Sequence, residues 1–372
     1  MADWFEPGYK AGGPIRSCVN FVQQMKDRYA IYIITTDRDL DATAPYDNVE
    51  INKWTSYGEG VEILYCSPGM LTWKQILKQV KQVAPAFIYL NSMFSKYFTI
   101  YPLLMVKREL VNTKIILSPR GMLKSSALQF KQTKKKIYLF LFRLLGLHKI
   151  ITFHATDVTE QADIKKIFGK KAEPVLASNF PGVVKEYPGS IPKNEKELSV
   201  IFIGRIHPIK NLDYLLNCVS AITGSVLLTV VGNEENKEYA QQCREMVQSF
   251  PPAVKVQFTG EIPNNEMSAV IAKHHIFALP TRGENFGHAI FEALAAGKPV
   301  LISDQTPWKN LAAVKAGWDI PLQQNNRFRE TLQQAVDFNQ QQYNEWSKGA
   351  WEYISKMIQQ SELKKAYNKL FS

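Results

Sequence analysis

The sequence has no long hydrophobic run, because no window reaches the roughly 18 consecutive apolar residues that a membrane-spanning helix needs. Its first residues, Met1 to Glu6, also lack the basic and then apolar pattern of a secretory signal peptide. The four cysteines are widely separated and form no Cys-x-x-Cys pair, which argues against a zinc site and a disulfide framework. We therefore expect a cytoplasmic protein with reduced cysteines and no bound metal.

Acidic residues are missing from one long part of the chain. Between Leu110 and Thr156 there are nine lysines or arginines and no aspartate or glutamate, and the whole chain has a formal net charge of +11. Phosphate-bearing ligands or anionic lipid fit such a surface. The region lacks the aromatic and basic pattern of known nucleic-acid-binding folds, so nucleic acid is not an expected partner.

Residues 131–145 combine a lysine cluster with an apolar helical stretch that is too short to span a bilayer. One interpretation is a helix that lies on an anionic membrane, which would give the protein a peripheral position at the inner face of the plasma membrane. The other is a core helix with a solvated basic start. The pattern is compatible with both.

Short β-rich runs alternate with helical stretches along most of the chain. In the first half these runs are residues 31–36, 61–66, 86–91, 114–118, 150–154 and 174–178. In the second half they are residues 199–203, 226–231, 254–258, 276–280 and 299–303. This alternation predicts an α/β protein with two doubly wound, Rossmann-like domains, each with a mainly parallel sheet covered by helices.

The composition changes to Pro, Gly, Lys and Glu around residues 182–197, which is typical of a linker. At 372 residues the chain also exceeds the usual size of a single core. We therefore predict an N-terminal domain over 1–184, a C-terminal domain over 185–345, and a final helical segment over 346–372 that packs back on the first domain. No Gly-x-Gly-x-x-Gly motif follows an early strand, which argues against a dinucleotide oxidoreductase.

The most informative stretch, residues 278–300, has the pattern of a strand, a loop, a helix and a second strand. The helix is expected to begin near Phe286 and Gly287, so its unpaired N–H groups face a loop where a phosphate can bind. Glu284 precedes this helix and Glu292 lies within it. Carboxylates suit the paired hydroxyls of a ribose or a sugar, although two glutamates at this spacing are common on ordinary helices.

Two further patterns point to an anionic ligand. Arg205 and Lys210 follow the buried strand 199–203, and the carboxyl ends of parallel strands are where ligands bind in open α/β sheets. Gly12-Gly13-Pro14 forms a glycine turn at a helix start, where the Gly13 amide can approach a phosphate. Each pattern alone also fits an ordinary solvated turn.

Together these residues resemble glycosyltransferase family 4, the group 1 enzymes that are retaining and have the GT-B fold. The resemblance runs from Trp4 to about Lys364. It rests on Gly12-Gly13-Pro14, Ser118-Pro119-Arg120-Gly121-Met122, His154-Ala155-Thr156, Gly204-Arg205 with Lys210-Asn211, and Glu284-Asn285-Phe286-Gly287 leading to Glu292. It implies that the two domains face a cleft.

By this resemblance, Arg205 and Lys210 hold the diphosphate of a nucleotide-sugar donor and stabilise the leaving group. Glu284 contacts the transferred sugar, and with the two cations it forms the predicted catalytic set. Glu292 binds the ribose hydroxyls of the donor.

The remaining donor contacts implied by the resemblance come from the backbone. Amides of Asn285, Phe286 and Gly287 contact sugar or phosphate, and Gly13 closes on the diphosphate from the first domain. No cofactor is expected, because the nucleotide sugar is a co-substrate.

The chain departs from many relatives at two places. Arg120 stands where many of them have a histidine, so Arg120 is an acceptor-side candidate. His154, which ends a strand, is the second acceptor-side candidate, although a lone histidine is more often structural. Relatives also have an apolar strand before the glycine turn, and that first strand is expected to be missing here.

The resemblance implies a sugar transfer with retained anomeric configuration, from a nucleotide-diphosphate sugar to a glycan or lipid-linked acceptor. Assembly of cell-surface polysaccharide is the expected process. A nucleotide-sugar epimerase of the same fold and a catalytically silent nucleotide-sugar-binding subunit are the alternatives.

Overall fold

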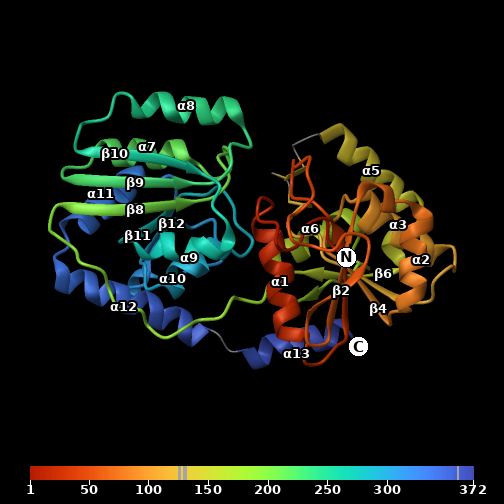
Figure 1. Ribbon diagram of the computed structural model, residues 1–372. Coiled ribbons are helices and arrows are strands. Elements are labelled where there is room, and N and C mark those ends of the chain that lie inside the picture. The colour runs from red at the N-terminus through yellow and green to blue at the C-terminus, as the bar shows by residue number, and fades with distance from the viewer. Residues whose placement is uncertain (125–126, 129–131, 358–359) are drawn as a thin grey trace. The chain divides into compact units, whose positions relative to one another are not determined.

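The computed structural model describes residues 1–124, 127–128, 132–357 and 360–372. The chain divides into two compact units (Figure 1). The N-terminal unit consists of Met1–Phe180 and Gln359–Ser372, and the C-terminal unit consists of Pro181–Ile358.

The C-terminal unit is built on a six-stranded sheet in which every neighbouring pair is parallel, with the order β10-β9-β8-β11-β12-β13. The strands are β8 (Glu197–Ile203), β9 (Ser225–Val231), β10 (Val254–Gly260), β11 (Ile276–Leu279), β12 (Val300–Ser303) and β13 (Gly317–Ile320). The helices are α7 (Leu212–Ser220), α8 (Lys237–Val247), α9 (Asn264–Ala272), α10 (His288–Ala295), α11 (Asn325–Asp337) and α12 (Gln340–Met357). This is the predicted doubly wound arrangement.

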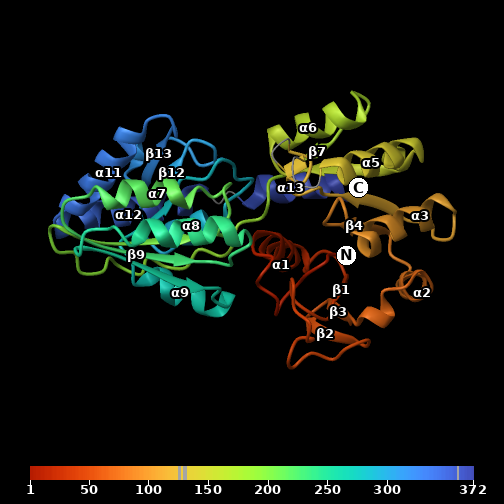
Figure 2. The same cartoon turned by 90° about the horizontal axis from the view of Figure 1, so that it is seen from above.

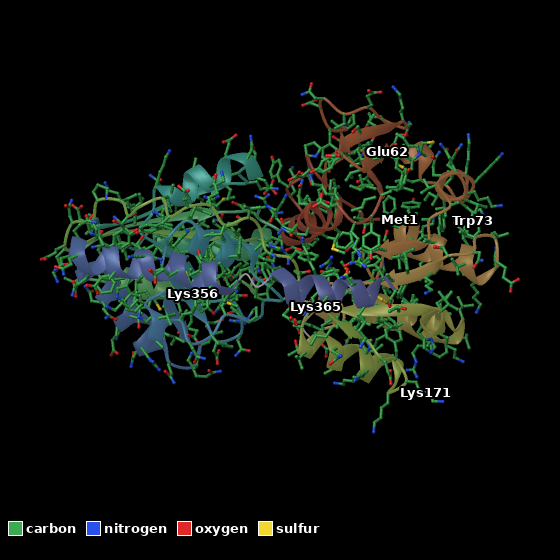
Figure 3. The ribbon with its side chains drawn as sticks, turned by 90° about the horizontal axis from the view of Figure 1, so that it is seen from below. Met1, Glu62, Trp73, Lys171, Lys356 and Lys365 are labelled. Carbon is green, nitrogen blue, oxygen red and sulfur yellow. The ribbon has the colours of Figure 1, made fainter. Side chains whose placement is uncertain are left out.

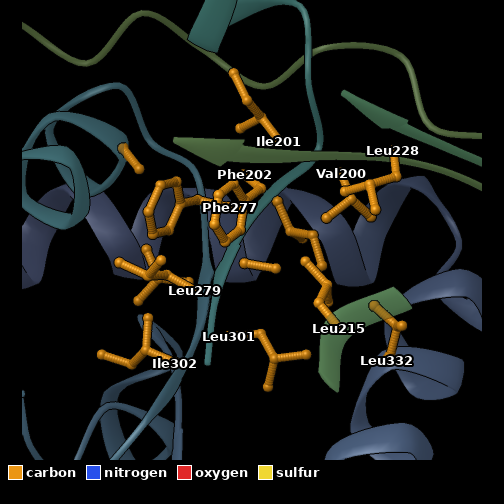
Figure 4. Packing of buried hydrophobic residues seen from close by; sticks show 14 of the residues in the cluster. Val200, Ile201, Phe202, Leu215, Leu228, Phe277, Leu279, Leu301, Ile302 and Leu332 are labelled. Carbon is orange, nitrogen blue, oxygen red and sulfur yellow. The ribbon is translucent and has the colours of Figure 1, made fainter. Parts of the chain in front are cut away.

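The core of this unit lies between the sheet and its helices (Figure 4). The central strands are buried along nearly their whole length, since β11 and β12 have no exposed residue. Phe202 of β8 and Phe277 of β11 pack in the same cluster as Leu215 of α7 and Leu332 of α11. A buried sheet of this kind holds the loops at its strand ends on a rigid frame.

The N-terminal unit contains two short sheets, with the orders β1-β3-β2 and β4-β5-β6-β7. The strands are β1 (Ile31–Thr36), β2 (Trp54–Gly58), β3 (Val61–Cys66), β4 (Phe87–Leu90), β5 (Lys114–Leu117), β6 (Ile151–Ala155) and β7 (Val175–Leu176). The helices are α1 (Gly13–Met25), α2 (Trp73–Val83), α3 (Tyr101–Lys107), α5 (Gln132–Leu144), α6 (Val158–Phe168) and α13 (Gln360–Leu370). All strand pairs are parallel except β2 with β3.

The first three residues lie between β1 and β4 and bond to both (Figure 2). The Met1 amino group donates to Tyr89 O at 2.8 Å, and Met1 O accepts from Asn91 N at 3.2 Å. On the other side, Ala2 N donates to Ile34 O at 3.2 Å. Residues 1–3 thus connect the two sheets where a strand was expected to be missing, and Figure 3 shows Met1 among the side chains of this unit.

The helical end of the chain differs from the single segment predicted for 346–372. Helix α12 buries Tyr343 and Ile354 in the core of the C-terminal unit, so it belongs to that unit. Helix α13 instead buries Tyr367 and Leu370 in the N-terminal unit. The division therefore falls between the two helices, because their apolar side chains have different partners.

Candidate functional site

The carboxyl ends of β8 and β9 approach each other closely in the C-terminal unit. Gly232 has a φ of +148°, and a Cβ built on it would lie 2.0 Å from Gly204 O, so only glycine fits. Ile206 N donates to Asn233 O at 2.7 Å across the same junction. The loop that carries Arg205 is therefore fixed against the loop after β9.

Arg205 forms an ion pair that crosses between these loops. Its Nη1 lies 2.5 Å from Glu235 Oε2, and the two side chains are 46% and 42% exposed. An exposed pair of this kind contributes little to stability. Arg205 can therefore exchange Glu235 for a phosphate oxygen at small energetic cost.

Lys210 and Glu284 meet at the carboxyl ends of β8 and β11, which are paired strands. Lys210 Nζ lies 2.5 Å from Glu284 Oε2, and the side chains are 14% and 19% exposed. The backbone supports this contact, since Arg282 N donates to Ile209 O at 2.7 Å. The predicted cation and the predicted acid thus share one site.

Helix α10 begins beside this ion pair. Gly287 is its N-cap with a φ of +79°, and a Cβ there would lie 3.1 Å from Glu284 Cγ. No side chain of the described residues caps this helix start, and the positive dipole end of a helix favours an anion. Trp308 Nε1 fixes the preceding turn by donating to Phe286 O at 2.5 Å.

Glu292 is half-buried in the second turn of α10. Asn285 and Phe286 lie in the loop between Glu284 and the Gly287 cap. Residues 284–292 therefore form one continuous segment at the end of β11. The helix itself starts at His288, shortly after the predicted position.

In the N-terminal unit, Gly13 is the first residue of α1 and follows Gly12, which has a φ of +63°. This is the glycine turn that the sequence predicted at a helix start. The assignment of the Gly13 amide to a diphosphate stays a prediction.

Arg120 follows β5 in a left-handed turn with a φ of +53°. Its guanidinium donates to three neutral acceptors: Tyr89 Oη at 3.0 Å, Asn91 Oδ1 at 2.7 Å, and Asn179 Oδ1. Arg120 Nε has no hydrogen-bond partner among the residues that the structure describes. Neutral partners orient the cation without cancelling its charge.

His154 is fully buried and bonded through both ring nitrogens. Nε2 lies 2.7 Å from Ala177 O, which can only accept, so Nε2 carries the hydrogen and Nδ1 accepts from the Tyr89 hydroxyl at 2.7 Å. Burial, and secondarily the charge of Arg120, lower the pKa of His154 to about 3. His154 is therefore a neutral support that orients Tyr89 toward Arg120, and its own ring does not reach the surface.

Residues 183–350 match the family described as Glycosyl transferases group 1. These residues are a group 1 glycosyltransferase domain. They include the whole six-stranded sheet and the contact between Lys210 and Glu284.

Known proteins resemble parts of the chain in sequence and the whole chain in fold. The O-antigen chain mannosyltransferase RfbU of Salmonella typhimurium is 30% identical over 114 residues, which are 31% of this chain and 32% of that protein. An uncharacterized 41.2 kDa protein in the cps region of Klebsiella pneumoniae is 22% identical over 238 residues, 62% of this chain and 63% of that protein. The matched region thus spans about a third of the length of the first relative and under two thirds of the length of the second.

The structure of Alr3699/HepE from Anabaena in complex with UDP-glucose has a TM-score of 0.70 to this chain. The match covers 99% of this chain and 98% of that chain at 14% sequence identity. The likeness shows the fold, which is the two-domain, Rossmann-like GT-B fold.

Two residues at this site in the group 1 domain were not predicted from the sequence. Glu235, the partner of Arg205, follows the predicted strand 226–231, so its place at the same sheet edge was the available signal. His207 is buried in the turn between Arg205 and Lys210. Burial lowers the pKa of His207, Glu235 raises it, and Arg205 and Lys210 lower it, with a net decrease.

Proposed function

We propose that this chain is a retaining glycosyltransferase that takes a sugar from a nucleotide-diphosphate sugar. The observation that carries the proposal is the 2.5 Å contact between Lys210 Nζ and Glu284 Oε2 beside the start of α10. It joins a cation and an acid to the positive end of a helix within the group 1 domain. Such a site suits a ligand with both phosphate and hydroxyl groups.

The main chemical demand of this reaction is the charge on the leaving group. As the bond between sugar and diphosphate breaks, negative charge develops on the phosphate oxygens. Arg205 and Lys210 supply fixed positive charge, and the first N–H groups of α10 add their dipoles. In the proposal this stabilisation needs neither a metal ion nor another cofactor, and the departing phosphate takes the proton of the acceptor.

The acids of the site have separate roles in the proposal. Glu284 faces the transferred sugar, and Glu292 accepts from the ribose hydroxyls. Backbone amides of Asn285 to Gly287 contact the sugar or the phosphate.

We further propose that the acceptor is a glycan or a lipid-linked sugar of a cell-surface polysaccharide, used on the cytoplasmic side of the membrane. Support for this class comes from the relative named as an O-antigen chain mannosyltransferase. Arg120 is the acceptor-side candidate, since its hydrogen-bond partners Asn91 and Asn179 are neutral acceptors.

Nucleotide binding tests the donor site directly. UDP, GDP, ADP and their sugars are added to the purified protein, and thermal unfolding is followed. One nucleotide diphosphate should stabilise by about 2.7 kcal/mol when present at a hundred times its dissociation constant. Arg205→Ala and Lys210→Ala should remove most of that shift.

Lys196→Ala is the matched control, because Lys196 pairs with Asp337 at 2.6 Å at the amino end of the same strand β8. Equal shifts in all variants would overturn the assignment. Turnover of the stabilising nucleotide sugar with an acceptor, followed by NMR of the product, tests transfer and retention. An isomerised donor sugar would indicate an epimerase, and binding without turnover a silent subunit.

A further inference from the structure

Helix α5 exposes a stripe of large apolar side chains that the protein core does not use. Ile137, Phe140, Leu141 and Leu144 are 55%, 64%, 46% and 70% exposed, and Leu145, directly after the helix, is 45% exposed. Their spacing of three and four residues places all five on one face of the helix. We call these five residues the α5 stripe.

The opposite face of α5 already makes the core contacts. Leu139 and Phe142 are buried in the core of the N-terminal unit, and Tyr138 Oη donates to Met93 O at 2.6 Å. Tyr138 also packs edge-on against Phe94. The helix is therefore anchored without the α5 stripe, so the core interpretation holds for this face, and the membrane interpretation stays a prediction.

Basic side chains border the α5 stripe. Lys136 and Arg143 are exposed and seven residues apart, so they lie along one border of it, and Lys134 is exposed at its amino-terminal end. Lys149 is exposed shortly after the helix. The sequence has no acidic residue from Leu110 to Thr156, so the α5 stripe and its border carry only positive charge.

We propose that the α5 stripe and its basic border dock this protein onto the surface of an anionic lipid bilayer. The apolar side chains enter the boundary between headgroups and acyl chains, and the lysine and arginine side chains pair with lipid phosphates. The 13 residues of α5 span about 20 Å, which is shorter than the roughly 30 Å of a hydrocarbon core, so the helix lies along the surface. Among the residues that the structure describes, no helix is long and apolar enough to cross a membrane.

Vesicle flotation with the full-length chain tests this proposal independently of any transferase activity. The protein should float with vesicles of phosphatidylcholine and phosphatidylglycerol, and much less with phosphatidylcholine alone. The double variant Phe140→Gln with Leu144→Gln should lose flotation. Because both side chains are mostly exposed, its thermal unfolding should match that of the unaltered protein.

Two further variants make the test specific. Lys136→Gln with Arg143→Gln should weaken binding to the anionic vesicles about 30-fold, at roughly a few-fold to tenfold for each lost charge, and added salt should mimic the effect. Val183→Gln removes an equally exposed apolar side chain, at 74%, from the C-terminal unit and should leave flotation unchanged.

The outcomes distinguish two partners that could cover the α5 stripe, a lipid surface and a second copy of the chain. Flotation that persists in the Phe140→Gln and Leu144→Gln variant overturns the proposal. A lipid-free dimer that this variant dissociates, with no flotation of the unaltered chain, also overturns it and assigns the stripe to a second copy of the chain.

Discussion

Replacing Glu284 by glutamine is expected to tighten the binding of a nucleoside diphosphate, whereas replacing Lys210 by methionine is expected to weaken it. The two side chains are in contact at 2.5 Å and are only 14% and 19% exposed, so each strongly affects the other. A diphosphate must draw Lys210 away from Glu284, and it is also repelled by the negative charge of the nearby Glu284 carboxylate. Glutamine keeps the size of the side chain and removes both costs.

The magnitudes follow from the kinds of interaction lost. Lys210→Met removes a charge-assisted hydrogen bond worth about 1.5–3 kcal/mol, so the dissociation constant should rise about 10- to 150-fold. Glu284→Gln removes a competing charge at an effective dielectric constant of about 20, and we expect about 1–2 kcal/mol, or roughly 5- to 30-fold tighter binding. Transfer by Glu284→Gln should nevertheless slow, because the acid that faces the sugar is gone.

Isothermal titration calorimetry with the stabilising nucleoside diphosphate measures both constants, and initial rates with the sugar donor measure transfer. Lys196→Met, at the exposed pair with Asp337, is the control and should bind as the unaltered protein does. The double variant of Lys210 and Glu284 shows whether the two effects are coupled. If Glu284→Gln weakens binding as much as Lys210→Met does, Glu284 holds the ligand and the competition argument is refuted.

Two predictions concern stability. Burial lowers the pKa of the Met1 amino group from 8.0 to about 6. Because the unfolded chain therefore holds this proton more tightly than the folded chain does, the free energy of unfolding should rise by up to about 2.7 kcal/mol between pH 6 and 8. Urea titrations at several pH values should show this rise in the unaltered protein and not in the protein with an acetylated α-amino group. The same pH dependence in both proteins would contradict the prediction. Gly232→Ala should destabilise by about 3 kcal/mol or more, because its Cβ would collide with Gly204 O at 2.0 Å. Gly283→Ala, whose Cβ meets no described atom within 4 Å, should cost less than about 1 kcal/mol, and equal losses would refute the steric explanation.

The strands that the sequence predicted best are those with continuous apolar patterns. The runs 31–36 and 61–66 coincide with β1, half of whose residues are buried, and with β3, which is mostly buried. Strand β2, Trp54–Gly58, was not predicted, because it lies at a sheet edge with no fully buried residue and has no strong apolar alternation. Burial is not the whole signal, because β13, Gly317–Ile320, has no exposed residue and was also not predicted.

The candidate site was predictable where its residues follow buried strands. Lys210 and Glu284 are 74 residues apart, yet both follow central strands, and the parallel sheet brings their loops together. The hydrogen bonds of Arg120 to Tyr89 and Asn179 could not be predicted, because they depend on the conformations of side chains from separate segments. Sequence periodicity identifies the strands but not these rotamers.

Helix α13 gives the N-terminal unit an unusual order of assembly. Tyr367 stacks on Phe180 with ring centroids 4.3 Å apart, and Phe371 packs against Phe21 and Tyr89 at 5.6 Å. On the ribosome, the first 180 residues emerge long before these aromatic partners do, whereas the group 1 domain is made from one uninterrupted stretch. The half of the protein that is translated first is therefore the half that is finished last.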